Sequence, residues 1–198
     1  MPRFVALFRG INVGKAKRIA MADLRTLLES LGYGQVRTLL NSGNAVFTAA
    51  GAASAIARRI RAEVANKLGV DAAVIVKSAV EVAGIIEDNA LVKVAKDDSR
   101  LLVAAVQDDA ALAAVEKIAA RRWGEERIHV GRHAAYLWCA HGILESEAIG
   151  PLFAALEDNC TTRNWGTLKK IHALLEEPAD GPASPVPRKK NACPADRR

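Results

Sequence analysis

The sequence lacks long hydrophobic runs and has few cysteines. No apolar run approaches the roughly 18 residues of a membrane-spanning helix. The basic N-terminus reaches Arg9 and Gly10 after a handful of apolar residues, too soon for the apolar core of a signal peptide. The three cysteines, Cys139, Cys160 and Cys193, have no framework spacing, so we expect reduced thiols. We therefore expect a cytoplasmic protein that does not enter a membrane.

The excess of positive charge is small once the C-terminal stretch is set apart. The formal net charge is +6, and residues 178–198 supply five Lys or Arg against two Asp, which is +3 and leaves +3 for the rest. That balance gives only weak support to nucleic-acid binding. The same stretch holds five prolines and no apolar periodicity, so we expect a disordered basic tail.

Apolar spacing predicts a pattern of strands and helices in the first half of the chain that the second half partly repeats. In the first half we expect strand, helix, strand, strand, helix, strand, which is the ferredoxin-like βαββαβ unit. Its strands lie at 4–9, on both sides of the turn 41–44, and at 72–78, and its helices end at Gly32 and Gly69.

The second half reads helix, strand, helix, strand, strand, then further helices. The expected elements are helix 80–89, strand 100–106, helix 110–122, two strands turning near 131–133, and helices 143–156 and 164–176. Gly150-Pro151 should break or kink the first of the last two helices. The prediction is an α+β fold of two ferredoxin-like halves packed together, with C-terminal helices and the tail, divided into 1–78, 79–177 and 178–198.

The stretch "FRGINVGKAKRIAM", residues 8–21, has the strand, glycine loop and helix order of many phosphate sites. It is not a Walker loop, because only three residues separate Gly10 from Gly14 and Ala16 follows Lys15 where a hydroxyl is needed. Glycine backbone N–H groups can still approach an anion closely. We predict a ligand site at this loop and the turn beside it, with Arg9, Asn12, Gly14, Lys15, Asn41, Ser42 and Asn44. The alternative is a plain turn with solvated lysines.

A second polar cluster is "TTRNWGTLKKI", residues 161–171. Thr162 is expected to cap a helix whose apolar stripe begins at Trp165. Arg163 and Asn164 would then lie in the first turn, where free backbone N–H groups attract anions, so they are candidates for the same ligand site.

Both stretches carry a family resemblance. The segment "ALFRGINVGKAKRIAMADLRTLLESLGYGQVRTLLNSGNAVF", residues 6–47, resembles the bacterial domain-of-unknown-function family 1697 (DUF1697), and "TTRNWGTLKKI" is similar to that family's closing signature. The resemblance covers about 1–176 and implies a duplicated ferredoxin-like α+β fold, but no activity. Family motif positions fall on Arg9, Gly10, Asn12, Gly14, Met21, Thr38, Ser42, Gly43, Asn44, Thr162, Arg163, Asn164, Trp165 and Thr167.

The chain departs from the family pattern at two places. Lys15 stands where relatives usually have a second glycine, and Glu147 stands where they tend to have a lysine after Ser146. The second departure reverses the charge at that position.

Other constellations have simpler explanations. Cys139 and His141 could face one side of a strand as zinc ligands, but His129 and His133 complete no regular metal spacing, so we expect no metal and no cofactor. Cys160 is expected to be a buried, inert thiol. The pairs Asp97-Asp98 and Asp108-Asp109 lie beside strands, and capping explains the second pair better than catalysis.

Three functions remain open at this point. The first is a binding module for a phosphate- or carboxylate-bearing small molecule at residues 9–18. The second is nucleic-acid binding, although Phe4, Phe8 and Phe47 are too few for an RNA-stacking sheet and are expected to fill the core between the halves. The third is a hydrolase or transferase, for which no nucleophile and base can be identified.

Overall fold

The structure is a computed structural model, and it describes residues 1–14 and 17–178. Within these residues the strands form two antiparallel four-stranded sheets, with the orders β2-β3-β1-β4 and β6-β7-β5-β8. Each order is that of a ferredoxin-like βαββαβ unit, so the expected α+β fold with two such halves is confirmed. The expected tail at 179–198 lies outside the described residues.

The elements of the first sheet follow the predicted order closely. They are β1 (Arg3–Phe8), α1 (Met21–Ser30), β2 (Gly34–Leu39), β3 (Asn44–Thr48), α2 (Ala53–Leu68) and β4 (Val74–Ser78). The second sheet and its helices comprise α3 (Ala79–Glu87), β5 (Leu101–Val106), α4 (Ala113–Ala119), β6 (Arg127–Val130), β7 (Ala134–Trp138), α5 (Ile149–Leu156), β8 (Cys160–Asn164) and α6 (Trp165–Glu176), with short 3-10 turns at η1 (Ala90–Lys93), η2 (Asp109–Leu112) and η3 (Glu157–Asn159).

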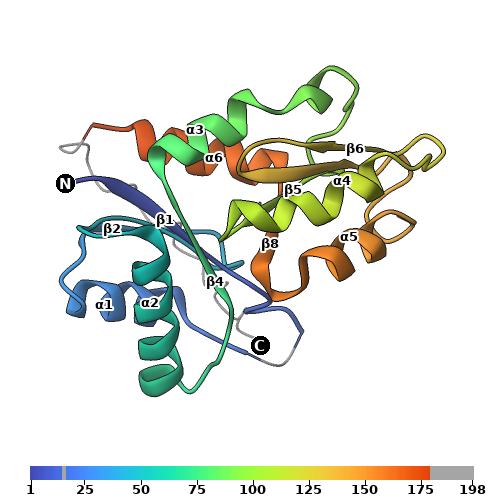
Figure 1. Cartoon of the computed structure of the whole chain (residues 1–198). Helices are drawn as coiled ribbons and strands as arrows, with labels where there is room; N and C mark the ends of the chain where they lie inside the picture. The colour runs from blue at the N-terminus through green and yellow to red at the C-terminus, as the bar shows by residue number, and fades with distance from the viewer. Residues whose placement is uncertain (15–16, 179–198) are drawn as a thin grey trace, which may run out of the picture.

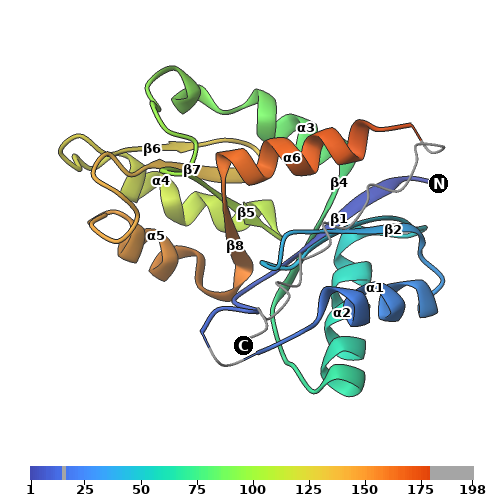
Figure 2. The same cartoon turned by 180° about the vertical axis from the view of Figure 1, so that it is seen from behind.

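Three apolar clusters hold the layers together (Figure 1). Helices α1 and α2 cover one face of the first sheet, and α4 and α5 cover the outer face of the second. The central cluster joins the remaining faces of both sheets to α3 and α6, which lie side by side (Figure 2). Alternation along β1 makes this possible, because Val5 and Leu7 face the central cluster while Phe4 and Phe8 face α1 and α2.

That alternation corrects one expectation. Phe4, Phe8 and Phe47 do not fill the core between the halves; all three lie under α1 and α2, on the other face of the first sheet. They are at most 5% exposed. The sheet therefore offers none of them as a surface for stacking bases.

The C-terminal region differs most from the predicted order. Residues 160–164 form strand β8 beside β5, so Thr162 is a strand residue and Asn164 is the helix cap, accepting from Thr167 N at 2.9 Å. Helix α5 begins at Ile149 rather than at 143. Pro151 then lies in its first turn, where a missing N–H costs no hydrogen bond, so the Gly150-Pro151 pair starts the helix instead of breaking it.

Polar contacts at β4 tie the two sheets to each other. Val76 N donates to Gln107 Oε1 at 2.8 Å, so a side chain of the second half occupies the edge of the first sheet. Lys77, whose side chain is 1% exposed, lies 3.0 Å from Glu81 Oε1 and 3.0 Å from Asp109 Oδ1. Because a buried ammonium is costly unless paired, these two carboxylates fix the spacing of β4 and the η2 turn.

Candidate functional site

The side chain of Arg163, on β8, lies at the centre of the residues that both sequence motifs single out. Its Nε donates to Asn44 Oδ1 at 2.6 Å, and its Nη1 donates to Thr161 Oγ1 at 3.0 Å and Thr162 O at 2.8 Å. Its Nη2 donates to the carbonyls of Phe8 at 2.8 Å, Ser42 at 3.1 Å and Gly43 at 3.1 Å. One guanidinium thus joins the end of β1, the β2–β3 turn and β8.

Every one of these acceptors is neutral. Among the residues that the structure describes, no carboxylate pairs with Arg163, although it is only 8% exposed. Burial lowers the pKa of Arg163 to about 10, so the side chain still carries its charge at neutral pH. The site therefore contains a buried positive charge that the surrounding protein solvates with dipoles but does not neutralise.

The β2–β3 turn is shaped to meet this arginine. Asn44 is fully buried, and its Nδ2 donates to Leu39 O at 2.8 Å and to Ser42 Oγ at 3.1 Å while its Oδ1 accepts from Arg163. Gly43 has a φ of +79°, and a Cβ there would lie 2.5 Å from Ile11 Cδ1. Only glycine fits both the backbone conformation and the space, which accounts for the motif at 42–44.

A cleft of about 410 Å³ opens beside Arg163 where the two halves meet. Of the predicted site residues, Arg9, Ser42, Arg163 and Asn164 line it. The other lining residues are mixed apolar and hydroxyl-bearing: Phe8, Gly10, Ile11, Val13, Phe153, Cys160, Thr161, Thr162 and Thr167. The residues that line the cleft within the described ranges include no histidine and no carboxylate.

Several donors in the cleft are not engaged by other described residues. No partner within the described part of the chain meets the Oγ1 of Thr162, the Oγ1 of Thr167 or the Nδ2 of Asn164. Arg9 uses its Nη1 for Glu157 O and for Asp158 Oδ1 at 3.1 Å, on a carboxylate whose side chain is 93% exposed. Exposed pairs of this kind are weak, so the Arg9 guanidinium can exchange Asp158 for a ligand.

The first turn of α6 also lies at the cleft. Asn164 Oδ1 caps it by accepting from Thr167 N, and Asn164 and Thr167 both line the cavity. Trp165 N is already bound to Asp98 O at 3.2 Å, and the Asp98 carboxylate pairs with Lys169. The helix end contributes a partial positive charge to the cleft, but few free N–H groups.

The remaining predicted residues have structural positions next to the cleft rather than in it. Asn12, at a φ of +58°, donates from Nδ2 to Ile19 O at 2.9 Å and Asn41 O at 2.8 Å, and accepts from Ile19 N at 2.9 Å. Asn12 and Asn41 line a separate shallow hollow, and Gly14, at a φ of +62°, continues the loop. Lys15 lies outside the described residues.

Two contributors were not anticipated from the sequence. Thr161 is 3% exposed and orders the guanidinium of Arg163 through its hydroxyl, and the carbonyl of Phe8 accepts from the same guanidinium. Neither has a clear signal in the sequence, because a five-residue strand followed at once by a helix shows too little periodicity, and a backbone carbonyl leaves no mark in the sequence.

The cysteines and histidines of the described residues form no reactive or metal-binding cluster. Cys139 and Cys160 are buried free cysteines, and burial raises the pKa of each thiol, so neither is a thiolate at neutral pH. His133 Nδ1 lies 2.6 Å from Asp109 Oδ2 and His141 lies beside Glu125. No group of three or more metal-ligating side chains occurs among the described residues. Cys193 lies outside them.

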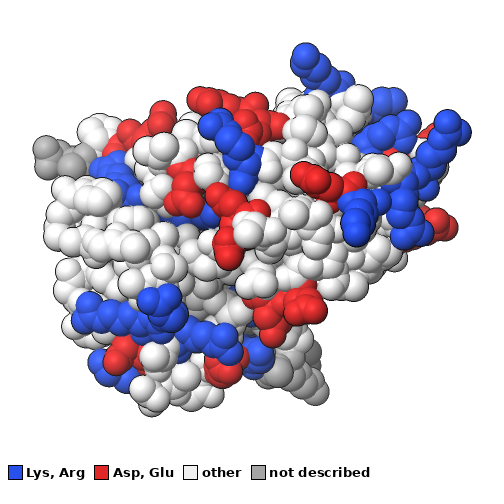
Figure 3. All heavy atoms as spheres, viewed as in Figure 1, with Lys and Arg blue, Asp and Glu red and all other residues white. Residues whose placement is uncertain are grey.

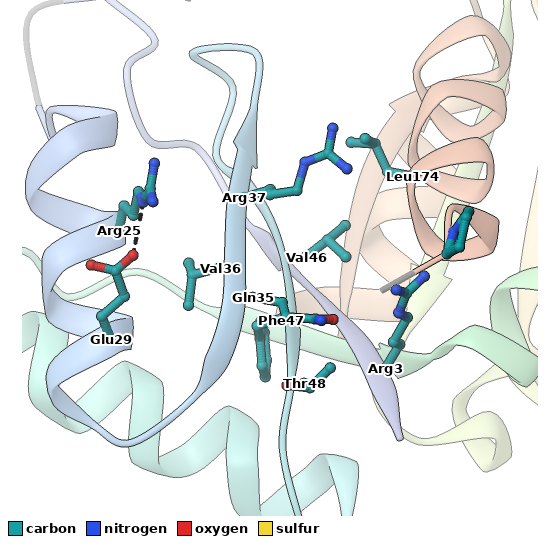
Figure 4. A pocket seen from close by; sticks show the side chains of 11 residues that line it. Arg3, Arg25, Glu29, Gln35, Val36, Arg37, Val46, Phe47, Thr48 and Leu174 are labelled. Atoms are coloured by element: carbon teal, nitrogen blue, oxygen red, sulfur yellow. Dashed lines mark hydrogen bonds and ion pairs between the residues drawn. The ribbon is translucent and has the colours of Figure 1, made fainter. Parts of the chain in front are cut away.

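A second basic cavity, of about 300 Å³, lies at β2 and the end of α6 (Figure 4). Its arginines are committed to neighbouring groups: Arg25 Nε binds Glu29 Oε1 at 2.8 Å, Arg3 donates to Leu175 O at 2.9 Å, and Arg37 pairs with Glu177. Figure 4 shows Arg37 extended across the cavity toward Leu174. These contacts anchor the end of α6, so the cavity is a weaker candidate than the Arg163 cleft.

Comparisons with known proteins identify the family. The model described as "Protein of unknown function (DUF1697)" matches residues 1–136. The chain belongs to the DUF1697 family. The matched range ends before β8, so it includes Arg9 and the β2–β3 turn but not Arg163, and it is shorter than the resemblance to 176 suggested.

One solved structure supports the same fold for the DUF1697 chain. It is described as a conserved bacterial protein, SP0830, from Streptococcus pneumoniae, and it is similar at 23% identity and a TM-score of 0.67 over 88% of this chain and 99% of that one. At this identity the likeness concerns the fold alone. The comparison with curated proteins gave no match. In the described residues, no helix is long and apolar enough to cross a membrane.

Proposed function

We propose that this DUF1697 protein binds a small molecule bearing a phosphate or carboxylate group in the Arg163 cleft. The observation that carries the proposal is the buried, un-neutralised charge of Arg163 at the wall of an open cavity. An anion placed there gains Coulomb energy from Arg163, Arg9 and the α6 N-terminus, in surroundings less polar than water.

The donors and the shape indicate how the ligand would be held. The N–H groups of Arg163 are already used by the protein, so Arg163 supplies charge and rigidity, while Arg9, Thr162 and Thr167 supply hydrogen bonds. Ile11, Val13 and Phe153 form an apolar wall for the rest of the molecule. The cleft volume falls within the range of small-molecule sites, roughly 300–1,000 Å³.

Binding is favoured over catalysis by the same lining. A hydrolase or transferase needs a positioned base or nucleophile, and the described lining residues include no histidine or carboxylate, while the Cys160 thiol is held protonated by burial. No observation on the described residues supports a second function at this cleft.

The proposal is tested by anion-dependent thermal stabilisation. Orthophosphate, pyrophosphate, a nucleoside monophosphate and citrate are titrated at constant ionic strength, and at least one should raise the unfolding midpoint saturably. Thr162→Val keeps the shape and strand preference while removing the hydroxyl, and Arg9→Gln removes the mobile charge; both should reduce the shift. Arg58→Gln, at an exposed position on α2, is the matched control and should leave the shift intact.

Two results would contradict this function. One is a midpoint that no anion in the panel raises beyond the effect of ionic strength. The other is a shift that Arg9→Gln and Arg58→Gln reduce equally, because this would mean that the anions act on the overall charge of the protein.

A further inference from the structure

The connection from α4 to β6 gathers positive charge around an aromatic ring. Residues 121–127, here called the arginine turn, contain Arg121, Arg122, Trp123 and Arg127. All three arginines are exposed, and a cavity of about 530 Å³ opens among them. Figure 3 shows Lys and Arg atoms collected over the end of the molecule where α4 and β6 lie in Figure 1. This region shares no residue with the Arg163 cleft.

Arg121 and Trp123 form a stacked pair. The Cζ of Arg121 lies 4.6 Å from the centroid of the Trp123 ring, which is the geometry of a cation–π contact. The indole is itself fixed, because its Nε1 donates to Ile118 O at 2.9 Å and its ring packs against the outer core of the second half. The exposed guanidinium plane of Arg121 is therefore held as a flat, cationic surface.

Arg127 and Arg122 flank this pair without a carboxylate partner among the described residues. Arg127 Nη1 donates to Gly124 O and Glu126 O, both at 2.7 Å, which fixes the side chain and leaves its Nη2 and Nε for other acceptors. No hydrogen bond or ion pair engages Arg122 within the described part of the chain.

The two acids of the arginine turn are engaged with other groups. Glu126 is 7% exposed, and its Oε2 accepts from Ala148 N at 3.1 Å. Glu125 Oε2 lies 3.4 Å from His141 Nε2. Three arginines against two glutamates leave residues 121–127 with a net positive charge, and because all three arginines face solvent, the turn attracts anions.

We propose that the arginine turn binds single-stranded nucleic acid. Phosphates would contact Arg122 and Arg127, and a base would stack on the Arg121 guanidinium, extending the Arg121–Trp123 stack. Bases are known to stack on arginine planes and aromatic rings, and phosphates to pair with arginine forks. This mode differs from RNA binding on a ferredoxin-like sheet, since here the sheet aromatics are buried and a turn supplies the contacts.

The test measures the binding of a fluorescent oligothymidylate to the full chain by anisotropy over a salt series. Because two of the three arginines, Arg122 and Arg127, would meet phosphates, Arg121→Gln/Arg122→Gln/Arg127→Gln should reduce the slope of log K against log salt by about 1.4, from about 0.7 per contact. The matched control is Arg58→Gln/Arg59→Gln/Arg61→Gln on α2, which removes the same charge from another arginine cluster and should leave the slope unchanged.

Tryptophan fluorescence gives a second readout. Trp138 and Trp165 are 8% and 6% exposed, so quenching by the oligonucleotide should come from Trp123 and should be lost in Trp123→Phe. Arg9→Gln should not weaken oligonucleotide binding, which separates this proposal from the function of the Arg163 cleft.

Several results would overturn the proposal. They are the absence of binding at low salt, an equal loss of slope in the two triple variants, or full displacement of the oligonucleotide by pyrophosphate at constant ionic strength, which would indicate a small phosphate site instead. A fall in the unfolding midpoint of the 121/122/127 variant with unchanged binding would assign these arginines to stabilising the end of α4.

Discussion

Replacing Arg163 by methionine should destabilise the protein while leaving its fold recognisable. The substitution removes both the unfavourable desolvation of the guanidinium and its favourable hydrogen bonds, and these two contributions to the free energy of unfolding oppose each other. The loss of stability is therefore set by the buried acceptors that remain without a donor. Gly43 O keeps a bond from Phe8 N at 2.9 Å, but Phe8 O and Asn44 Oδ1 lose their close donors inside fully buried residues. At about 1–3 kcal/mol for each unsatisfied buried acceptor, the loss is about 2–6 kcal/mol.

Urea unfolding followed by circular dichroism measures this loss, and thermal unfolding should show a midpoint lowered by at least about 4 °C. Arg163→Lys keeps the charge but has three donors on one atom and cannot span six acceptors, so it should recover only part of the stability. Arg25→Met, at an exposed helix position, should cost no more than about 0.5 kcal/mol. If Arg163→Met matched that control, or if lysine restored full stability, the account of Arg163 as a multidentate link would be refuted.

Two further predictions concern the buried pair at β4. The double variant Glu81→Gln/Asp109→Asn leaves the buried Lys77 ammonium without a carboxylate partner and should lower the free energy of unfolding in urea by about 3–5 kcal/mol. Adding Lys77→Met should restore most of that loss. A triple variant no more stable than the double variant would contradict this. Burial alone would raise the pKa of Glu81, but the hydrogen bonds from Ser78 and Lys77 outweigh burial and lower this pKa below 4.5. The ionised Glu81 therefore contributes fully to stability above pH 4.5, and this contribution disappears as the pH falls through the pKa of the folded state. The stability of Glu81→Gln should accordingly fall less below pH 4.5 than that of the parent, and parallel pH profiles would argue against the assignment.

Local pattern accounted for most of the fold. The βαββαβ order of the first half follows from apolar spacing and from glycines at helix ends, and the same spacing predicts every strand of the second half except β8. What failed was the segment 160–164, because a five-residue strand followed at once by a helix leaves too little periodicity to separate the two. The placement of Phe4, Phe8 and Phe47 failed for another reason: both faces of β1 are buried, so sequence cannot say which one faces the helices.

The candidate cleft was predictable only in part. Charge and glycine content drew attention to residues 9–18 and 161–171, and the fold brings Arg9 and Arg163 to one cavity. The role of Asn12 could not be read from sequence, because its side chain bonds the carbonyls of Ile19 and Asn41, and these meet it only after the loop has closed. The hydrogen bonds that occupy every N–H of Arg163 could not be predicted either, because most of their acceptors belong to the first half of the chain.

The position of Arg163 late in the chain predicts an order of events in folding. The first sheet is complete by Ser78, and domains generally fold from the N-terminus during synthesis. The guanidinium that fills the space between Phe8 and the β2–β3 turn is contributed by a residue 155 positions after Phe8. Until β8 has been made, the carbonyls of Phe8 and Ser42 can be satisfied only by water. We therefore expect closure of this long loop to be a late step of folding, with the cleft forming together with it.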